Sequence, residues 1–122
     1  MSTTTEKDIE RKLRRLVEKY GGQCLKWVCP GWSGVPDRIV LLPRGRICFV
    51  ETKRPKGGRL SELQQWWGRR LTDLGFAYWV VWNEEDLRVF EQDELSWTAW
   101  EDLDWEDLED WEGLEDWEGL EE

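Results

Sequence analysis

The sequence predicts an α/β protein whose mixed sheet is flanked by helices, in the order α-β-β-β-α-β. Two observations predict it. Segments with the apolar spacing of a helix alternate with short runs rich in β-branched and aromatic residues, and turn residues separate them. A length of 122 residues suits one compact domain of modest size and is too short for two.

Two segments repeat apolar residues at helical spacing. The first, residues 5–22, follows threonines that can cap it and ends at a pair of glycines. The second, residues 61–75, begins at Ser61 and ends at Gly75. We therefore expect two amphipathic helices, one before the first strand and one before the last.

Four segments have the composition of strands. They are residues 23–30, 37–42, 46–53 and 76–82. The last of them is dense in β-branched and aromatic residues, which suits a buried position. Residues 43–45 form a three-residue loop between the second and third strands, and Gly45 in the left-handed conformation makes this a common hairpin type. The hairpin then pairs Leu42 with Arg46.

Charged side chains lie at the end of this hairpin that is away from its loop. A hairpin that serves only to build the core does not need charged residues there. The register sets Asp37 opposite Glu51, and strand alternation puts Glu51 and Lys53 on one face. A two-residue loop would instead oppose Asp37 to Thr52 and separate the group. Two carboxylates on adjacent strands can hold a hard divalent cation such as Mg²⁺, and a neighbouring lysine can stabilise charge on a phosphoryl group. The other interpretation is a surface carboxylate beside an ordinary Glu–Lys pair.

Composition excludes several classes of site. The chain has no histidine, which excludes Ser-His-Asp and Cys-His catalysis and any zinc site that needs imidazole. Its three cysteines, Cys24, Cys29 and Cys48, are an odd number for a disulfide framework, and the N-terminus lacks the features of a signal peptide. We therefore expect reduced thiols in an intracellular, cytoplasmic protein. No run of about 18 apolar residues is present, so no membrane span is expected.

Charge is divided unevenly along the chain. Residues 91–122 carry 16 of the 27 acidic residues and none of the 17 basic ones, whereas residues 1–90 carry 17 basic against 11 acidic residues. A basic body is consistent with a polyanionic partner such as nucleic acid. We expect a folded domain at residues 1–92 and a flexible acidic tail at residues 93–122.

The expected tail is rich in tryptophan and ends in three hexads, DWEDLE and twice DWEGLE. A period of six residues fits neither a helix nor a strand well, and the like charges repel each other. The tail is therefore interpreted as a solvated appendage or a partner-binding segment. A third hypothesis is an internal polyanion that contacts the basic body and competes with nucleic acid.

Four motifs in order resemble the VRR-NUC domain, a branch of the PD-(D/E)xK nuclease superfamily, over roughly residues 5–90. They are TEKDIE in the first helix, GVPD before a strand, ETK at the end of the next strand, and LSELQ at the second helix. The resemblance implies a restriction-endonuclease-like core and metal-dependent DNA cleavage with Mg²⁺ or Mn²⁺. It also implies a homodimer that acts on branched DNA, such as a four-way junction or a flap.

The resemblance assigns roles to the charged end of the hairpin. It implies that Asp37 and Glu51 ligate the metal, with the backbone carbonyl of Thr52 as a third ligand. It implies that Lys53 is the catalytic lysine.

Two further catalytic residues are expected from the helices. Gln64 matches the glutamine of the LSxxQ motif, with Gln65 as the alternative if the register slips. Glu6 matches the acidic residue of the first helix, and helical geometry places it roughly 40° from the centre of the apolar stripe. A glutamate that faces the core needs a partner such as a cation, and Glu10, at the edge of the stripe, is the weaker candidate.

The loop after the third strand, RPKGGR, contains Arg54, Lys56 and Arg59. Its position beside the expected site makes these residues candidates for holding the DNA backbone. The alternative function is a catalytically inactive module that binds DNA or a repair protein without turnover.

Overall fold

The protein is described by a computed structural model over residues 5–96. Its centre is one four-stranded sheet in the order β1 (Gln23–Lys26), β2 (Arg38–Leu42), β3 (Arg46–Thr52) and β4 (Ala77–Val81). β1 and β2 are antiparallel, as are β2 and β3, whereas β4 runs parallel to β3. The predicted mixed sheet is therefore confirmed.

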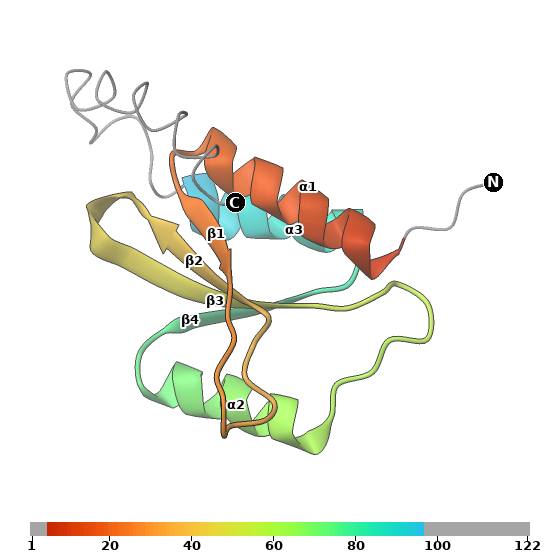
Figure 1. The fold of residues 1–122 in the computed structure, drawn as a ribbon. Coiled ribbons are helices and arrows are strands. Elements are labelled where there is room, and N and C mark those ends of the chain that lie inside the picture. The colour runs from red at the N-terminus through yellow and green to blue at the C-terminus, as the bar shows by residue number, and fades with distance from the viewer. Residues whose placement is uncertain (1–4, 97–122) are drawn as a thin grey trace.

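Helices cover both faces of the sheet (Figure 1). They are α1 (Glu6–Lys19), α2 (Glu62–Asp73) and α3 (Glu84–Phe90). α1 and α3 lie on one face, and α2 lies on the other. None of the helices within residues 5–96 combines the length and the apolar character needed to cross a membrane.

The main core lies between α1 and the sheet. The apolar stripe of α1 contributes Ile9, Leu13 and Val17, all fully buried, because their three- and four-residue spacing puts them on one side of the helix. They pack in one cluster with Val40 of β2 and Val50 of β3. This packing fixes the rotation of α1 about its axis, and with it the direction of every other side chain on the helix.

Both predicted helices begin at capped residues. Thr5 caps α1, its hydroxyl accepting a hydrogen bond from the Asp8 amide while the Asp8 carboxylate accepts one from the Thr5 amide. Ser61 caps α2 in the same way with Gln64. The first turn of each helix is therefore held in place.

The hairpin has the register that its three-residue loop predicts. Leu42 pairs with Arg46 and Arg38 pairs with Val50, so Asp37, directly before β2, lies at the same end of the sheet as Glu51. The loop is a short 3₁₀ turn in which Gly45 has a positive φ of 73°.

The packed elements continue beyond residue 92, where the end of the folded domain was expected. α3 and a π-helical turn, Glu91–Leu95, follow β4, and neither element was predicted. Glu94, only 7% exposed, forms an ion pair with Arg46 and accepts a hydrogen bond from Trp79 Nε1 at 2.9 Å. The repeats of the expected tail, and any contact between the tail and the body, lie outside the described residues.

Candidate metal centre

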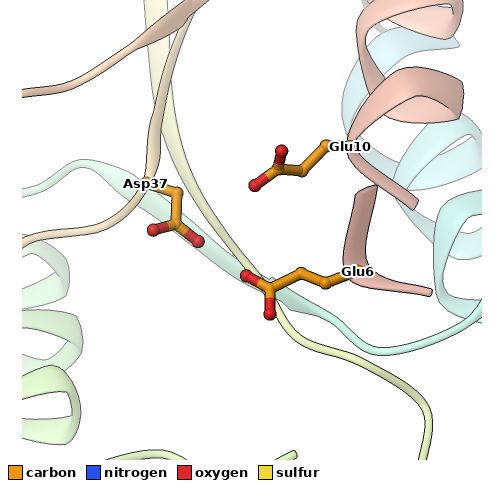
Figure 2. Close-up of side chains that lie close together, drawn as sticks. All are labelled: Glu6, Glu10 and Asp37. Carbon is orange, nitrogen blue, oxygen red and sulfur yellow. The ribbon is translucent and has the colours of Figure 1, made fainter. Parts of the chain in front are cut away.

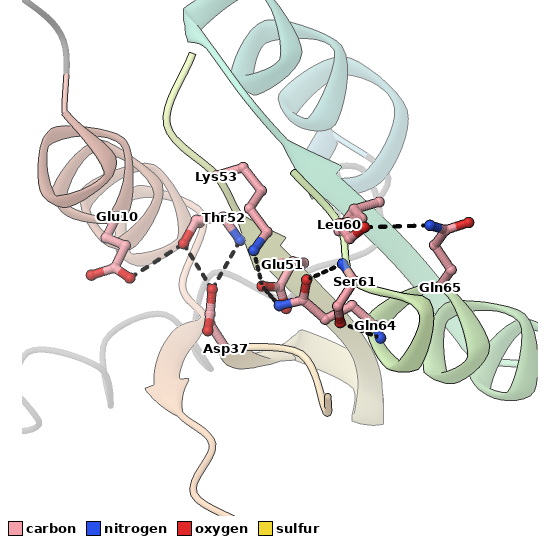
Figure 3. A network of polar contacts seen from close by, with 9 residues as sticks. All are labelled: Glu10, Asp37, Glu51, Thr52, Lys53, Leu60, Ser61, Gln64 and Gln65. Atoms are coloured by element: carbon pink, nitrogen blue, oxygen red, sulfur yellow. Dashed lines mark hydrogen bonds and ion pairs between the residues drawn. The ribbon is translucent and has the colours of Figure 1, made fainter. Parts of the chain in front are cut away.

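Acidic and amide side chains from four separate segments meet at one end of the sheet (Figure 3). Asp37 directly precedes β2, and Glu51 and Thr52 end β3. The first turns of α1 bring Glu10, and the first turn of α2 brings Gln64. The core packing of α1 and the cap of α2 thus determine which helical residues reach this point.

The site extends across both faces of the sheet. Neighbouring residues of a strand point to opposite faces, and here Glu51 points to the α2 side while Thr52 points to the α1 side. Gln64 Nε2 of α2 donates to Glu51 Oε1 at 2.9 Å, and Thr52 Oγ1 lies 3.2 Å from Glu10 Oε1 of α1. Asp37 lies between the two groups.

Glu51 is a buried acid with one incompletely bonded oxygen. It is 1% exposed, and its Oε1 accepts from Gln64 and lies 3.6 Å from Lys53 Nζ. Its Oε2 is buried without a hydrogen-bond partner among the described residues. The Asp37 side chain raises the pKa of Glu51 and the Asp37 amide opposes this, but neither group meets hydrogen-bonding geometry with Oε2. The two carboxylates can bond to each other only when one carries a proton.

Burial makes the charged form of Glu51 unfavourable in the absence of a cation. Burial first, and then the negative charge of Asp37, raise the pKa of Glu51 from 4.5 to about 8, and the ammonium of Lys53 opposes only part of this effect. A divalent cation at this position would favour the charged carboxylate.

Asp37 is held from the β3 side. Its Oδ2 accepts hydrogen bonds from the Thr52 amide at 3.2 Å and from the Thr52 hydroxyl at 3.1 Å. Its own carbonyl accepts from the Trp27 amide at 2.8 Å, which fixes the backbone at the start of β2. Both the backbone and the side chain of Asp37 are therefore positioned.

Glu6 and Glu10 both reach Asp37 (Figure 2). One carboxylate oxygen from each of the three residues lies within 4.8 Å of the other two. Ligands of one hard cation at about 2.1–2.6 Å can be separated by distances of this size. Burial, then the charges of Asp37 and Glu10, raise the pKa of Glu6. The structure thus brings both glutamates to the site, whereas the helical stripe indicated mainly Glu6.

The two adjacent glutamines, Gln64 and Gln65, make different contacts. Gln64 reaches Glu51 with its amide nitrogen, while its amide oxygen accepts from the Ser61 backbone at 2.9 Å as part of the helix cap. Gln65 instead donates to the Leu60 carbonyl at 3.4 Å (Figure 3). Gln64, and not Gln65, therefore lies in the site.

The basic residues predicted to contact DNA lie in the loop that follows β3. Arg54 donates to the Gly57 carbonyl at 3.4 Å, and its positive charge opposes part of the rise in the pKa of Glu6. Lys56 and Arg59 are exposed. Their role in binding DNA stays a prediction.

Sequence reasoning missed two contributors to the site. Thr52 was considered only for its backbone carbonyl, yet its side chain contacts both Asp37 and Glu10. Arg38 was not considered, and its Nη2 lies 3.6 Å from Glu10 Oε2. Strand alternation, which turns Thr52 and Arg38 to the face that α1 covers, was the signal that could have pointed to both.

The fold matches a PD-(D/E)xK nuclease core, and the comparisons place the protein in the nuclease class. The family model of the VRR-NUC domain matches residues 2–85. One relative is p44 from Acyrthosiphon pisum secondary endosymbiont phage 1, a protein named as a nuclease. It is 42% identical to this chain over 87 residues, which cover 71% of this chain and 91% of p44. A solved VRR-NUC domain superposes with a TM-score of 0.69 at 27% identity, covering 75% of this chain and 99% of that domain. The chain belongs to the VRR-NUC family.

Proposed function

We propose that the protein is an endonuclease that hydrolyses DNA phosphodiester bonds with Mg²⁺ or Mn²⁺ held by Asp37 and Glu51, and by the backbone carbonyl of Thr52. The observation that carries the proposal is Glu51 Oε2, a buried acceptor without a donor beside a second carboxylate. The Lys53 ammonium lies beside Oε1, so a cation is still needed at Oε2 for the buried carboxylate to carry its charge at low cost. The donors are all oxygen atoms, which suits a hard cation.

The surrounding residues divide the chemistry between them. The cation, when bound, polarises a phosphate oxygen and lowers the pKa of a water molecule. Lys53, with its ammonium 3.6 Å from Glu51 and its side chain 16% exposed, can stabilise the charge that develops on the phosphoryl group. Gln64 holds Glu51 in one orientation, and Glu6 adds negative charge on the α1 side.

The DNA backbone would pass over the loop after β3. Arg54, Lys56 and Arg59 supply positive charge there, next to Lys53. Phosphate contacts of this kind position a duplex without reading its sequence.

We further propose branched DNA as the substrate and a homodimer as the active form, in replication, repair or recombination. A body of this size has little surface for reading bases, which favours recognition of DNA shape. Leu25, Leu41 and Ile47 are exposed on the sheet face opposite α1, where Leu41 pairs with Ile47 and Leu25 is the diagonal neighbour of Leu41. Burial of this apolar surface against a second copy would set two sites against paired strands.

Cleavage of a labelled four-way junction, a flap and a linear duplex tests the proposal. Each substrate is incubated with Mg²⁺, Mn²⁺ or EDTA, and the wild type is compared with Lys53→Ala. Lys19→Ala serves as the matched control, since Lys19 is exposed at the far end of α1. Cutting that requires the metal and disappears only in Lys53→Ala supports the nuclease. Binding of DNA by the wild type without cutting in either metal would favour the inactive binding module.

A further inference from the structure

Thr52 is the middle residue of the Glu51-Thr52-Lys53 motif, and its side chain is fully buried. Strand alternation turns it away from the face that Glu51 and Lys53 share. Its hydroxyl nevertheless lies 3.1 Å from Asp37 Oδ2, because Asp37 stands outside β2 and its side chain reaches across the end of β3. The Thr52 amide donates to the same oxygen at 3.2 Å. Both groups of one residue therefore hold one oxygen of Asp37.

The hydroxyl has two acceptors and one proton. Its Oγ1 also lies 3.2 Å from Glu10 Oε1, so the carboxylates of Asp37 and Glu10 compete for the same hydrogen. The guanidinium of Arg38, 3.6 Å from the other oxygen of Glu10, partly neutralises Glu10 and makes it the weaker acceptor.

Asp37 is the better placed of the two acceptors. Its Oδ2 already accepts from the Thr52 amide, which holds it next to the hydroxyl of the same residue, whereas Glu10 has the Arg38 guanidinium beside it. The hydroxyl proton is therefore drawn toward Asp37, and Asp37 Oδ2 accepts two donors at once.

We propose that Thr52 is a positioning residue, whose hydroxyl and amide together fix Asp37 Oδ2 so that Oδ1 stays available to the cation. The inference rests on the proposed function, because it takes Asp37 as a ligand. A ligating carboxylate that is already oriented binds its cation without losing rotational freedom. The middle residue of the motif thereby acts through its side chain, in addition to the role proposed for its carbonyl.

Manganese binding to the full chain without DNA tests this inference directly. Free Mn²⁺ is followed by its EPR signal during titration of the wild type, Thr52→Val and Thr52→Ser. Loss of an outer hydrogen-bond partner of a metal ligand weakens affinity by about 10–100-fold. Since the Thr52 amide remains, we expect about 10-fold weaker binding for Thr52→Val, and affinity within about 3-fold of the wild type for Thr52→Ser.

A matched control removes a hydroxyl elsewhere. Thr72 Oγ1 donates to the Gly68 carbonyl within α2, so Thr72→Val removes one hydrogen bond far from Asp37. Its manganese affinity should equal that of the wild type. Valine has a high strand propensity and the branched shape of threonine, so Thr52→Val should fold. Near-ultraviolet circular dichroism checks this, and Thr52→Ala provides a second variant without the hydroxyl.

The outcomes separate this inference from the proposed function. If Thr52→Val and Thr52→Ala bind manganese as tightly as the wild type, the inference is wrong and the nuclease proposal stands. If Thr52→Ser is as weak as Thr52→Val, the hydroxyl is not the cause and the inference is again wrong. If the wild type binds no manganese and cuts no DNA, the proposed metal site fails and the inference fails with it.

Discussion

Replacing Glu51 by glutamine should make the metal-free protein more stable at neutral pH, although it removes a proposed metal ligand. Glu51 is almost completely buried and its pKa is raised from 4.5 to about 8. A glutamine has nearly the shape of the protonated acid and keeps an acceptor for Gln64. The substitution therefore removes a charge that the fold disfavours.

The sign and size of this effect follow from proton linkage. A raised pKa means that the folded protein binds the proton more tightly than the unfolded chain does. The resulting stability is fully present below pH 4.5 and is lost as the pH rises through about 8. At about 1.4 kcal/mol per pH unit within this window, the wild type should lose about 2.5 kcal/mol from Glu51 between pH 5 and pH 7.

Urea denaturation in EDTA, followed by tryptophan fluorescence at pH 5, 6, 7 and 8, measures this difference. The free energy of unfolding of Glu51→Gln minus that of the wild type should grow with pH. Glu62→Gln, which removes an exposed acid from the start of α2, controls for the change in net charge. A difference that stays constant over the whole range, or a wild type that is the more stable protein at pH 8, would refute the reasoning.

Three other predictions follow from the same contacts. Because a ligand must lose its proton to bind a cation, manganese affinity should rise about tenfold from pH 6 to pH 7, and calorimetry in two buffers should detect about one proton released. Gln64→Ala should lower the free energy of unfolding by about 1 kcal/mol through loss of the α2 cap and should slow DNA cleavage, whereas Gln65→Ala should cleave normally. Arg46→Met leaves Glu94 buried without its ion pair. The free energy of unfolding measured in urea should fall by about 3 kcal/mol. An unchanged value would mean that residues 91–95 do not pack on the domain.

The parts of the fold that local rules govern could be predicted from the sequence. The spacing of Ile9, Leu13 and Val17 predicts both the helix and its buried face, and the structure confirms them. The three-residue loop determines the hairpin register, which brings Asp37 and Glu51 to the same end of the sheet. Each of these inferences uses residues that are close together in the chain.

The missed features depend on contacts between distant residues. The segment after β4 is rich in acids, so composition alone groups it with the tail, but Glu94 is stabilised in the core by Arg46, 48 residues earlier. Alternation predicts that Thr52 points away from its neighbours in the motif, and it does. Its contact with Asp37 arises because Asp37 lies just outside β2, a boundary that depends on how the chain enters the sheet.

The position of the site across the end of the sheet has a mechanical consequence. Adjacent residues of β3 contact opposite layers, Glu51 through Gln64 to α2 and Thr52 through Glu10 to α1. A cation bound between them would act as a cross-link that joins the two helical layers near the N-terminal ends of α1 and α2. Hydrogen exchange of the amides in these two turns should then slow together when the ion binds, although α1 and α2 lie on opposite faces of the sheet. Binding of the ion would therefore make the end of the sheet between α1 and α2, where the proposed DNA substrate binds, more rigid.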